Sequence, residues 1–483
     1  MGEEFDMQRS GVSRPLALLA AGGCLFLGVL SSVAGAAAPM FITAPGSPLA
    51  ADGPNWEAIA DVNRDGRLDL AVANELTDSV SIRLGDGTGG FGAPTAVPVG
   101  DTPTSLALAD FTRDGRLDMA VANPGSDNVT IHIGDGTGGF SAGSPIGLPD
   151  APWYIEVGDV NRDKRLDLVV PHVGSIVGTS FVASHDVSIL LGDGKGNFSP
   201  APGSPLTVGR VPYGARIADL NGDKYPDLAI ANQFDNYISI LFGNGTGQFS
   251  EAPISPITVG AGPTWLTADD LNHDGTSDIA LAVASGTVAV LLGDGTGGFE
   301  HAPGSPISLS GVPHDMLAAD FDRDGHLDLG VDRLGIDSFS VLLGDGAGGF
   351  SLASTTPVGD LPLSMGIGDV DGDGKLDVAT GNYFGNSVSV LLNRSVTPSD
   401  TISSLRVGVL DSSVKEGLRT SLAEKLLAAE RWAGLENAKA CSKLNAFVQQ
   451  VDAKTGSDGL TVDVAEEWIE AADGVREDLG CVA

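Results

Sequence analysis

Oxygen-bearing side chains recur at fixed spacing in seven short stretches of this sequence. The first is Asp61-Val-Asn-Arg-Asp-Gly-Arg-Leu-Asp69, with Asp or Asn at positions 1, 3, 5 and 9. Neither sulfur nor imidazole occupies these four positions in any stretch. Hard oxygen ligands on a tight loop suit Ca²⁺, which accepts about six to eight oxygens in a flexible shell. The sequence therefore predicts Ca²⁺ as cofactor, up to seven ions, one per stretch.

The stretches return at a near-constant period, with steps of 49, 49, 60, 51, 50 and 49 residues between their first aspartates. Self-similarity of this kind indicates a repeat architecture. The predicted calcium ligands are Asp61, Asn63, Asp65, Asp69; Asp110, Thr112, Asp114, Asp118; Asp159, Asn161, Asp163, Asp167; Asp219, Asn221, Asp223, Asp227; Asp270, Asn272, Asp274, Asp278; Asp320, Asp322, Asp324, Asp328; and Asp369, Asp371, Asp373, Asp377.

An EF-hand has the same first ligand positions, but it needs Glu at position 12 and a helix on each side. Position 12 of the first stretch is Val72, inside an apolar run typical of a strand. Thr112 at position 3, and Lys164 and Lys224 where the other stretches have glycine at position 6, predict three weaker sites. The alternative for any single stretch is a solvated turn.

Each repeat predicts four short strands. In the second repeat these are Thr104–Asp110, Leu117–Asn123, Asn128–Gly134 and Phe140–Leu148, with a glycine-dense hairpin between the last two. Short antiparallel strands in radial repetition predict a mainly β fold, a seven-bladed β-propeller of four-stranded blades in residues 37–395.

The ends of the array predict how the ring closes. The seventh repeat stops at its third strand, Ser387–Asn393, and the segment Phe41–Pro48 matches fourth strands such as Phe299–Pro306. We therefore expect the N-terminal segment to supply the outer strand of the last blade.

The pattern Ala109-Asp-Phe-Thr-Arg-Asp-Gly-Arg-Leu-Asp-Met-Ala-Val-Ala-Asn123 resembles the FG-GAP/VCBS repeats of integrin-α-like propellers. The resemblance implies seven blades with Ca²⁺ in the loop between the first and second strand of each. Relatives include lectins, adhesion modules and some polysaccharide lyases, so the fold leaves the function open.

The two ends of the chain differ from the repeats. Residues 1–36 read as an export signal, with an uncleaved membrane anchor as the alternative. A linker is expected at 396–402, and helical spacing of apolar residues predicts a small bundle in 403–483. Cys441 and Cys481 predict one disulfide in an exported chain, with a thiol pair as the alternative. The run Lys439–Val451 resembles the C-terminal helical domain called FIMAH.

A formal net charge of −36 argues against nucleic acid or an anionic membrane surface as partner. We expect a monomer that is secreted or held at the cell surface. The repeats place six aromatic side chains in loops opposite the calcium stretches, where they could bind a glycan, the alternative being that they pack the channel mouth. These predicted ligand-binding residues are Trp56, Trp153, Tyr154, Tyr213, Trp265 and Tyr383.

Catalysis has weaker support, because the sequence has neither a Walker loop nor zinc-ligand spacing. His172, Tyr213, His314 and Arg333 could together abstract a proton beside a uronate carboxylate, if the fold brings them together. The favoured interpretation is a calcium-stabilised, non-catalytic module that binds an extracellular glycan or protein surface. A polysaccharide lyase and a purely structural cell-surface spacer are the alternatives.

Overall fold

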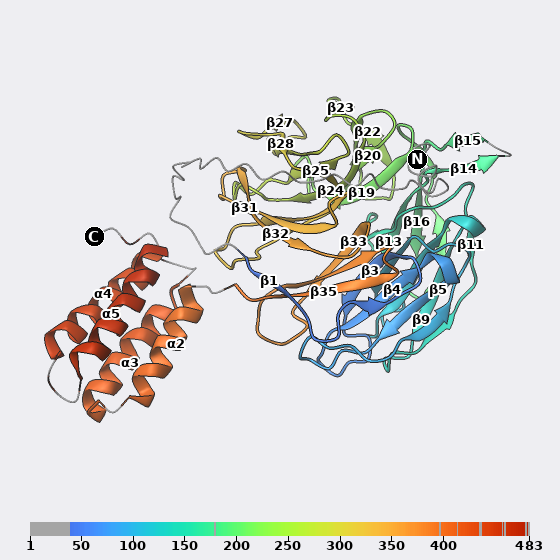
Figure 1. The fold of residues 1–483 in the computed structure, drawn as a ribbon. Coiled ribbons are helices and arrows are strands. Elements are labelled where there is room, and N and C mark those ends of the chain that lie inside the picture. Colours follow the sequence, from blue (N-terminus) through green and yellow to red (C-terminus); the bar gives the residue numbers. More distant parts are fainter. Residues whose placement is uncertain are drawn as a thin grey trace, which may run out of the picture.

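The computed structural model describes residues 39–177, 180–395, 398–412, 414–433, 437–455, 457, 460–478 and 481. The predicted export signal, residues 1–36, lies outside these ranges. Within them, a β-sheet unit is followed by a group of helices (Figure 1). None of the helices described is long and apolar enough to span a membrane.

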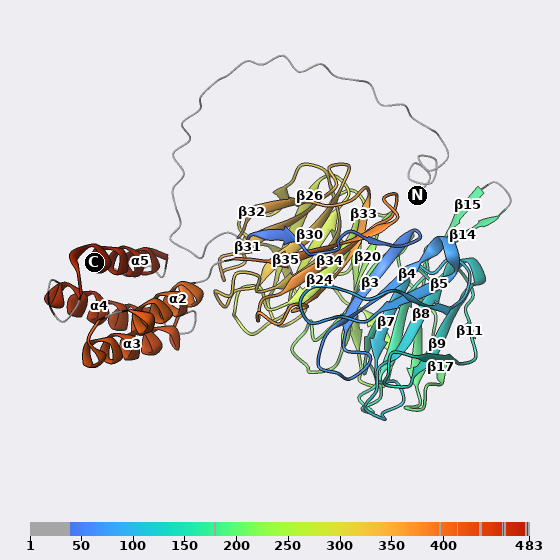
Figure 2. The same ribbon diagram turned by 60° about the horizontal axis from the view of Figure 1, so that its bottom comes forward.

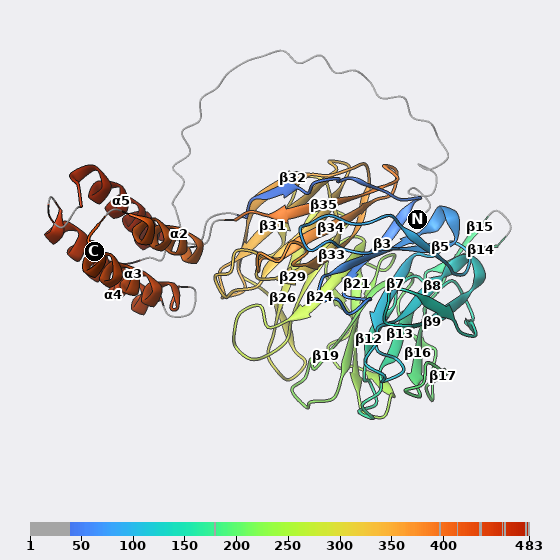
Figure 3. The ribbon, with the colours of Figure 1, turned by 90° about the horizontal axis from the view of Figure 1, so that it is seen from below.

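Seven antiparallel sheets in the described chain form the blades of a propeller, arranged around a common axis (Figures 2 and 3). Blades 1 to 3 are β3 (Pro54–Ala60), β4 (Asp69–Asn74), β5 (Ser79–Arg83), β6 (Thr95–Pro98); β7 (Ser105–Ala109), β8 (Asp118–Asn123), β9 (Asn128–Gly134), β10 (Phe140–Ala142), β11 (Ile146–Gly147); and β12 (Glu156–Gly158), β13 (Asp167–Pro171), β16 (Asp186–Gly192), β17 (Phe198–Pro200), β18 (Leu206–Thr207).

Blades 4 to 7 repeat the same order. They are β19 (Pro212–Ala218), β20 (Asp227–Asn232), β21 (Tyr237–Gly243), β22 (Phe249–Glu251), β23 (Ile257–Thr258); β24 (Pro263–Asp269), β25 (Asp278–Val283), β26 (Thr287–Gly293), β27 (Phe299–His301), β28 (Ile307–Ser308); β29 (Val312–Ala319), β30 (Asp328–Leu334), β31 (Ser338–Gly344), β32 (Phe350–Pro357); and β33 (Pro362–Gly368), β34 (Asp377–Asn382), β35 (Ser387–Asn393), β1 (Phe41–Thr43), β2 (Leu49–Ala50).

The second strand of each blade is buried on both faces, which explains its continuous apolar run. Every residue of β8 is buried, and its Ala120 and Ala122 share a core with Leu168 and Val170 of the next blade. The hydrophobic cores thus lie between neighbouring blades, and small side chains allow the sheets to approach closely.

The ring closes as predicted. Strand β1 pairs antiparallel with β35, with Phe41 opposite Asn393, and β2 pairs further along the same strand, with Leu49 opposite Val388 (Figure 1). Segments from the two ends of the array therefore complete one sheet, so its pairing links residues more than 300 positions apart.

The outer strand is split in most blades, where the sequence predicted one strand. In blade 2, β10 and β11 both pair with β9, and Gly143, Ser144 and Pro145 separate them. Proline has no N–H to donate to a ladder, which ends the pairing there. Blade 6 lacks this Ser-Pro pair, and its outer strand β32 runs unbroken.

The extra residues of the third repeat form a separate hairpin of β14 (Gly174–Val177) and β15 (Ser180–Ala183) between β13 and β16. The hairpin projects from the ring, away from the blade that carries it (Figures 1 to 3).

Four helices follow the propeller in the described residues: α2 (Pro398–Asp411), α3 (Glu416–Glu430), α4 (Asn437–Lys454) and α5 (Val462–Asp478). They share one apolar core that includes Leu422, Phe447 and Trp468. Helix α2 begins at Pro398, so most of the segment expected as a linker, 396–402, is helical. Cys441 and Cys481 form the predicted disulfide.

Candidate functional site

Each aspartate stretch lies in the loop between the first and second strand of its blade. In blade 1, β3 ends at Ala60, the stretch begins at Asp61, and Asp69 is the first residue of β4. Because the strands alternate in direction, all seven of these loops lie on one face of the ring, called the acidic face below. Each predicted set of four oxygen side chains therefore belongs to one loop and the start of the strand that follows it.

The aspartate at position 9 of each stretch is buried and accepts two backbone hydrogen bonds. In blade 1, Val62 N donates to Asp69 Oδ2 over 3.0 Å and Gly85 N donates to Asp69 Oδ1 over 2.8 Å. The same pair of bonds forms at Asp167, Asp227, Asp278, Asp328 and Asp377. Asp118 also accepts two, but there the first donor is Thr112 N at position 3 in place of position 2. Position 9 therefore joins the acidic loop to the end of the third strand.

Sequence reasoning assigned position 9 only a ligand role and missed this structural one. Invariance gave no distinguishing signal, because positions 1 and 5 are also Asp in every stretch and only position 3 varies. Only an ionised carboxylate accepts at both oxygens, which an amide cannot do. Burial raises the pKa of Asp278 to about 6, against the lowering effect of the two backbone donors.

Positions 1, 3 and 5 fold the loop around its own backbone. Asp61 accepts hydrogen bonds from Asp65 N over 3.1 Å and Gly66 N over 2.9 Å, and Asn63 Oδ1 accepts from Asp65 N over 2.9 Å. These exposed oxygens keep further lone pairs, so they can also hold a cation. Lys164 and Lys224 stand at position 6 with φ of +66° and +68°, a region that favours glycine.

Two loops bring their carboxylates closest. Oxygens of Asp320, Asp322 and Asp328 lie within 4.8 Å of one another, as do oxygens of Asp369, Asp371 and Asp373. In the first group, burial and the neighbouring aspartates raise the pKa of Asp322 to about 8. Carboxylates this close repel one another unless a proton or a cation neutralises them, and an all-oxygen set is the kind Ca²⁺ prefers. The residues present fit a calcium ion.

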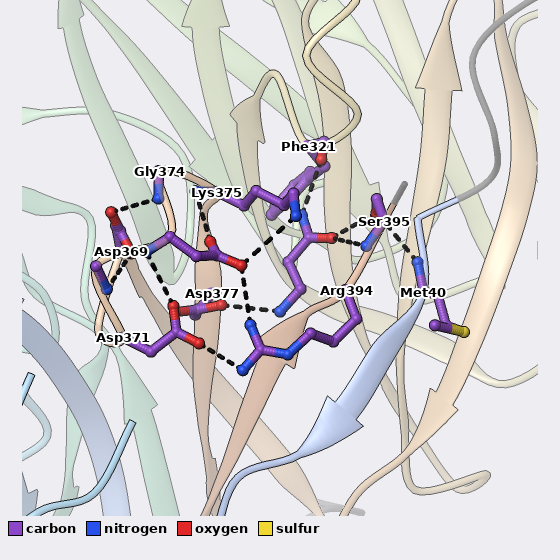
Figure 4. A network of polar contacts seen from close by, with 12 residues as sticks. Met40, Phe321, Asp369, Asp371, Gly374, Lys375, Asp377, Arg394 and Ser395 are labelled. Atoms are coloured by element: carbon purple, nitrogen blue, oxygen red, sulfur yellow. Dashed lines mark hydrogen bonds and ion pairs between the residues drawn. The ribbon is translucent and has the colours of Figure 1, made fainter. Parts of the chain in front are cut away.

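The loop of blade 7 also contacts a cation of the chain itself (Figure 4). Arg394 lies 2.5 Å from Asp371 Oδ2 through Nη2 and 2.9 Å from Asp373 Oδ2 through Nη1. Lys375 Nζ is 3.5 Å from the same Asp373 oxygen. The backbone N–H of Arg394 donates to the carbonyl of Met40 over 2.7 Å, beside the strand that closes the ring.

Five of the six predicted ligand-binding aromatics meet on the channel axis, on the face opposite the acidic loops. Ring centres lie 4.5 Å apart for Tyr154 and Trp265, 4.9 Å for Trp56 and Trp265, and 5.4 Å for Trp153 and Tyr213. Only Trp56 and Trp153 are more than marginally exposed, and Trp265 is 3% exposed. This burial favours packing of the channel mouth over a stacking platform for sugars.

The sixth aromatic, Tyr383, lies apart from this cluster. Its ring is 5.6 Å from the exposed Phe384, and burial, followed by the neighbouring Glu75, raises its pKa well above the usual value. It belongs to the loop after the second strand of blade 7.

Three carboxyl groups lie buried in the channel beneath the aromatic cluster. Ser364 donates to Glu57 Oε2, Thr380 donates to Asp332 Oδ2 over 2.5 Å, and Asp315 accepts from Met316 N and Met365 N. Burial raises the pKa of Glu57 to about 8 and of Asp315 to about 7, and it raises that of Asp332 strongly. Arg216 lies beside them, within 2.8 Å of Tyr154 Oη and 3.3 Å of Glu156. Sequence reasoning missed this group.

The four residues proposed for a lyase are not assembled. Tyr213 Oη and His314 Nε2 lie 3.0 Å apart. His172, however, forms hydrogen bonds with Asp150 O and Ser188 Oγ. Arg333 donates to Ser310 and Thr355 within blade 6. Successive side chains of a strand point to opposite faces, so Asp332 lies on the channel side of β30 and Arg333 lies on the opposite side. The structure thus brings Tyr213 and His314 together and gives His172 and Arg333 other partners.

A propeller with acidic loops on one face defines the class of this protein. The sequence profile of the FG-GAP-like repeat matches residues 61–121, 111–170, 176–230, 219–281 and 270–331, and that of the FG-GAP repeat matches 362–392. The chain belongs to the FG-GAP-like repeat family.

No curated protein matches the sequence. Among solved structures, BBS1N in complex with ARL6DN, soaked with lead, is similar with a TM-score of 0.53 and 14% identity over 74% of this chain and 97% of that one. A protein from Lactobacillus plantarum is similar with a TM-score of 0.51 and 16% identity over 66% of this chain and 89% of that one. These likenesses concern the fold alone.

Proposed function

We propose that this protein is a calcium-stabilised, non-catalytic binding module that acts outside the cell. The observation that carries the proposal is the crowding of Asp320, Asp322 and Asp328, whose oxygens lie within 4.8 Å of one another. Bound Ca²⁺ would supply the positive charge that such a loop lacks. Extracellular calcium modules bind with Kd of about 10⁻⁴ to 10⁻³ M, so even weak loops fill outside a cell.

The Cys441–Cys481 disulfide supports an oxidising, extracellular location. Four strands per blade, seven blades and a closed ring place the loops rigidly, and rigid scaffolds with variable loops are suited to binding. The calcium ligands in each loop would be the residues at positions 1, 3, 5 and 9, with position 9 keeping its two backbone hydrogen bonds.

The binding surface in this proposal is the face opposite the acidic loops, formed by the loops between the second and third strands. Exposed apolar side chains lie in these loops: Leu76 is 61% exposed, Phe384 46% and Ile336 41%. The β14–β15 hairpin adds Val182 to the same side of blade 3. Since most of the channel aromatics are buried, a protein surface fits these side chains better than a sugar ring does.

The calcium part of the proposal is tested by thermal unfolding. The melting temperature should fall in chelator and recover with Ca²⁺ but poorly with Mg²⁺, which demands tighter octahedral geometry. Asp274→Ala should lower the melt in Ca²⁺ more than Asp163→Ala, because the loop of Asp163 has Lys164 where that of Asp274 has Gly275. A melting temperature that is the same with and without chelator would contradict the proposal.

The binding part is tested on arrays of glycans and of extracellular proteins, in Ca²⁺. We expect the wild type to bind and the double variant Leu76→Asp, Phe384→Asp to lose binding. The control variant Lys195→Asp, on the acidic face, should bind as the wild type does. Absence of binding on both arrays would favour the structural cell-surface spacer. Formation of unsaturated ends from uronate polysaccharides would favour the lyase.

A further inference from the structure

Side chains from neighbouring acidic loops meet at several junctions around the ring. Position 4 of one loop lies beside position 7 of the next: the Arg162 guanidinium is 5.2 Å from the ring centre of Tyr225. Likewise, Arg64 and Arg116 both approach Gly136, where an added Cβ would lie 3.4 Å and 2.8 Å from their Cδ atoms. The fold therefore pairs two side chains from different repeats at these junctions.

Histidine occupies both places at the junction of blades 5 and 6. His273 Nε2 and His326 Nδ1 lie 3.0 Å apart, and the ring centres are 5.1 Å apart. His273 is exposed and His326 half-buried, so the pair lies at the surface of the ring. Two imidazole nitrogens thus meet on a face whose other candidate ligands are oxygens.

We propose that His273 and His326 form a binding site for a divalent transition metal, Ni²⁺ or Cu²⁺, that uses side chains of two acidic loops other than their predicted calcium ligands. Imidazole nitrogen binds these ions well, whereas Ca²⁺ and Mg²⁺ prefer oxygen. Two metal–nitrogen bonds of about 2.1 Å whose ends lie 3.0 Å apart enclose an angle of roughly 90°.

That angle is compatible with Cu²⁺ or Ni²⁺ as the bound ion. It is the angle between adjacent ligands in square-planar or octahedral geometry, which Cu²⁺ and Ni²⁺ adopt, whereas structural zinc is tetrahedral. Water completes the coordination on the open side of the two rings. The ion would join blade 5 to blade 6 at the surface. At the equivalent junction of blades 3 and 4, Arg162 and Tyr225 make such a link without a metal.

The test is Ni²⁺ titration by calorimetry of the full-length, tag-free protein, in excess Ca²⁺ so that the acidic loops are already occupied. We expect one Ni²⁺ per chain in the wild type. His273→Arg and His326→Arg should each weaken binding at least about tenfold, a loss that even outer-shell changes cause at metal sites. His185→Arg, a histidine elsewhere, should bind Ni²⁺ as the wild type does.

The arginine variants are chosen to keep the fold. Position 4 is already Arg64, Arg113, Arg162 and Arg323 in other loops, all with φ near that of His273 at +59°. Equal melting temperatures in Ca²⁺ alone would verify this. His273→Asn then removes the ligand without adding charge, and it should lose Ni²⁺ to the same extent. Unchanged Ni²⁺ affinity in the His273 and His326 variants, or no Ni²⁺ bound by the wild type, would overturn the proposal.

Discussion

Arg394 Nη2 lies 2.5 Å from Asp371 Oδ2, so the acidic loop of blade 7 forms an ion pair with an arginine that lies beside the closing strand. Arg394 follows β35 directly, its N–H donates to Met40 O, and the helical unit begins four residues later at Pro398. One residue therefore contacts a predicted calcium loop and the ring closure (Figure 4).

We predict that Arg394→Gln lowers the melting temperature in chelator, and that the loss relative to the wild type is smaller in Ca²⁺. Without calcium, the guanidinium offsets repulsion among Asp369, Asp371 and Asp373, and a bound ion would do so in its place. Thermal unfolding in chelator and in Ca²⁺ measures both effects. Arg64→Gln, an exposed arginine on the same face, is the control. An equal deficit in both buffers would show that Arg394 acts independently of calcium.

Position 9 should matter even without calcium. Asp278→Asn leaves Leu271 N and Gly293 N with one acceptor between them, at a cost of about 1–3 kcal/mol. Asp274→Asn at position 5 keeps its acceptor for Thr276 N and should cost little in chelator. Denaturant unfolding in chelator measures the difference, and equal loss for the two variants would refute the structural role of position 9.

Lys164 stands in left-handed backbone at the place where five other loops have glycine. Lys164→Gly should raise the free energy of unfolding by about 1 kcal/mol, because a side chain in this conformation costs about that much. The reverse change, Gly66→Lys, should lower it by a similar amount, since Gly66 has φ of +84°. Denaturant unfolding of both variants checks the prediction, and changes of equal sign would contradict it.

The buried Glu57 should make stability fall as the pH rises. Its pKa is about 8 in the folded protein against 4.5 ordinarily, so between these values the native state keeps a proton that the unfolded chain has lost. Raising the pH through this window lowers the free energy of unfolding.

Glu57→Gln should remove this loss. We expect it to stabilise the protein at pH 8 by at least about 1.4 kcal/mol, the value of one pKa unit, and to have less effect at pH 5. Melting curves at several pH values measure this, with the exposed Glu300→Gln as control. A variant with the same pH dependence as the wild type would assign the buried proton to Asp315 or Asp332 instead.

The repeats made much of the fold predictable. Strands, loops and the split between propeller and helices follow from local patterns, and the match between Phe41–Pro48 and Phe299–Pro306 predicted the closure that β1 and β35 make. The break in the outer strand was missed because its cause, a Ser-Pro pair, interrupts an otherwise strand-like run. The helical resemblance to FIMAH stays a prediction.

By itself, the sequence determined the Cys441–Cys481 pair and the features of the repeat array: seven blades, their closure and the oxygen sets of the loops. These depend on short-range periodicity and on matching ends. Only the tertiary structure decided which side chains from different blades meet. It buried Trp265 against Tyr154, separated His172 and Arg333 from Tyr213, and joined His273 to His326. The rotation between blades sets those meetings, and no pattern within one repeat encodes it.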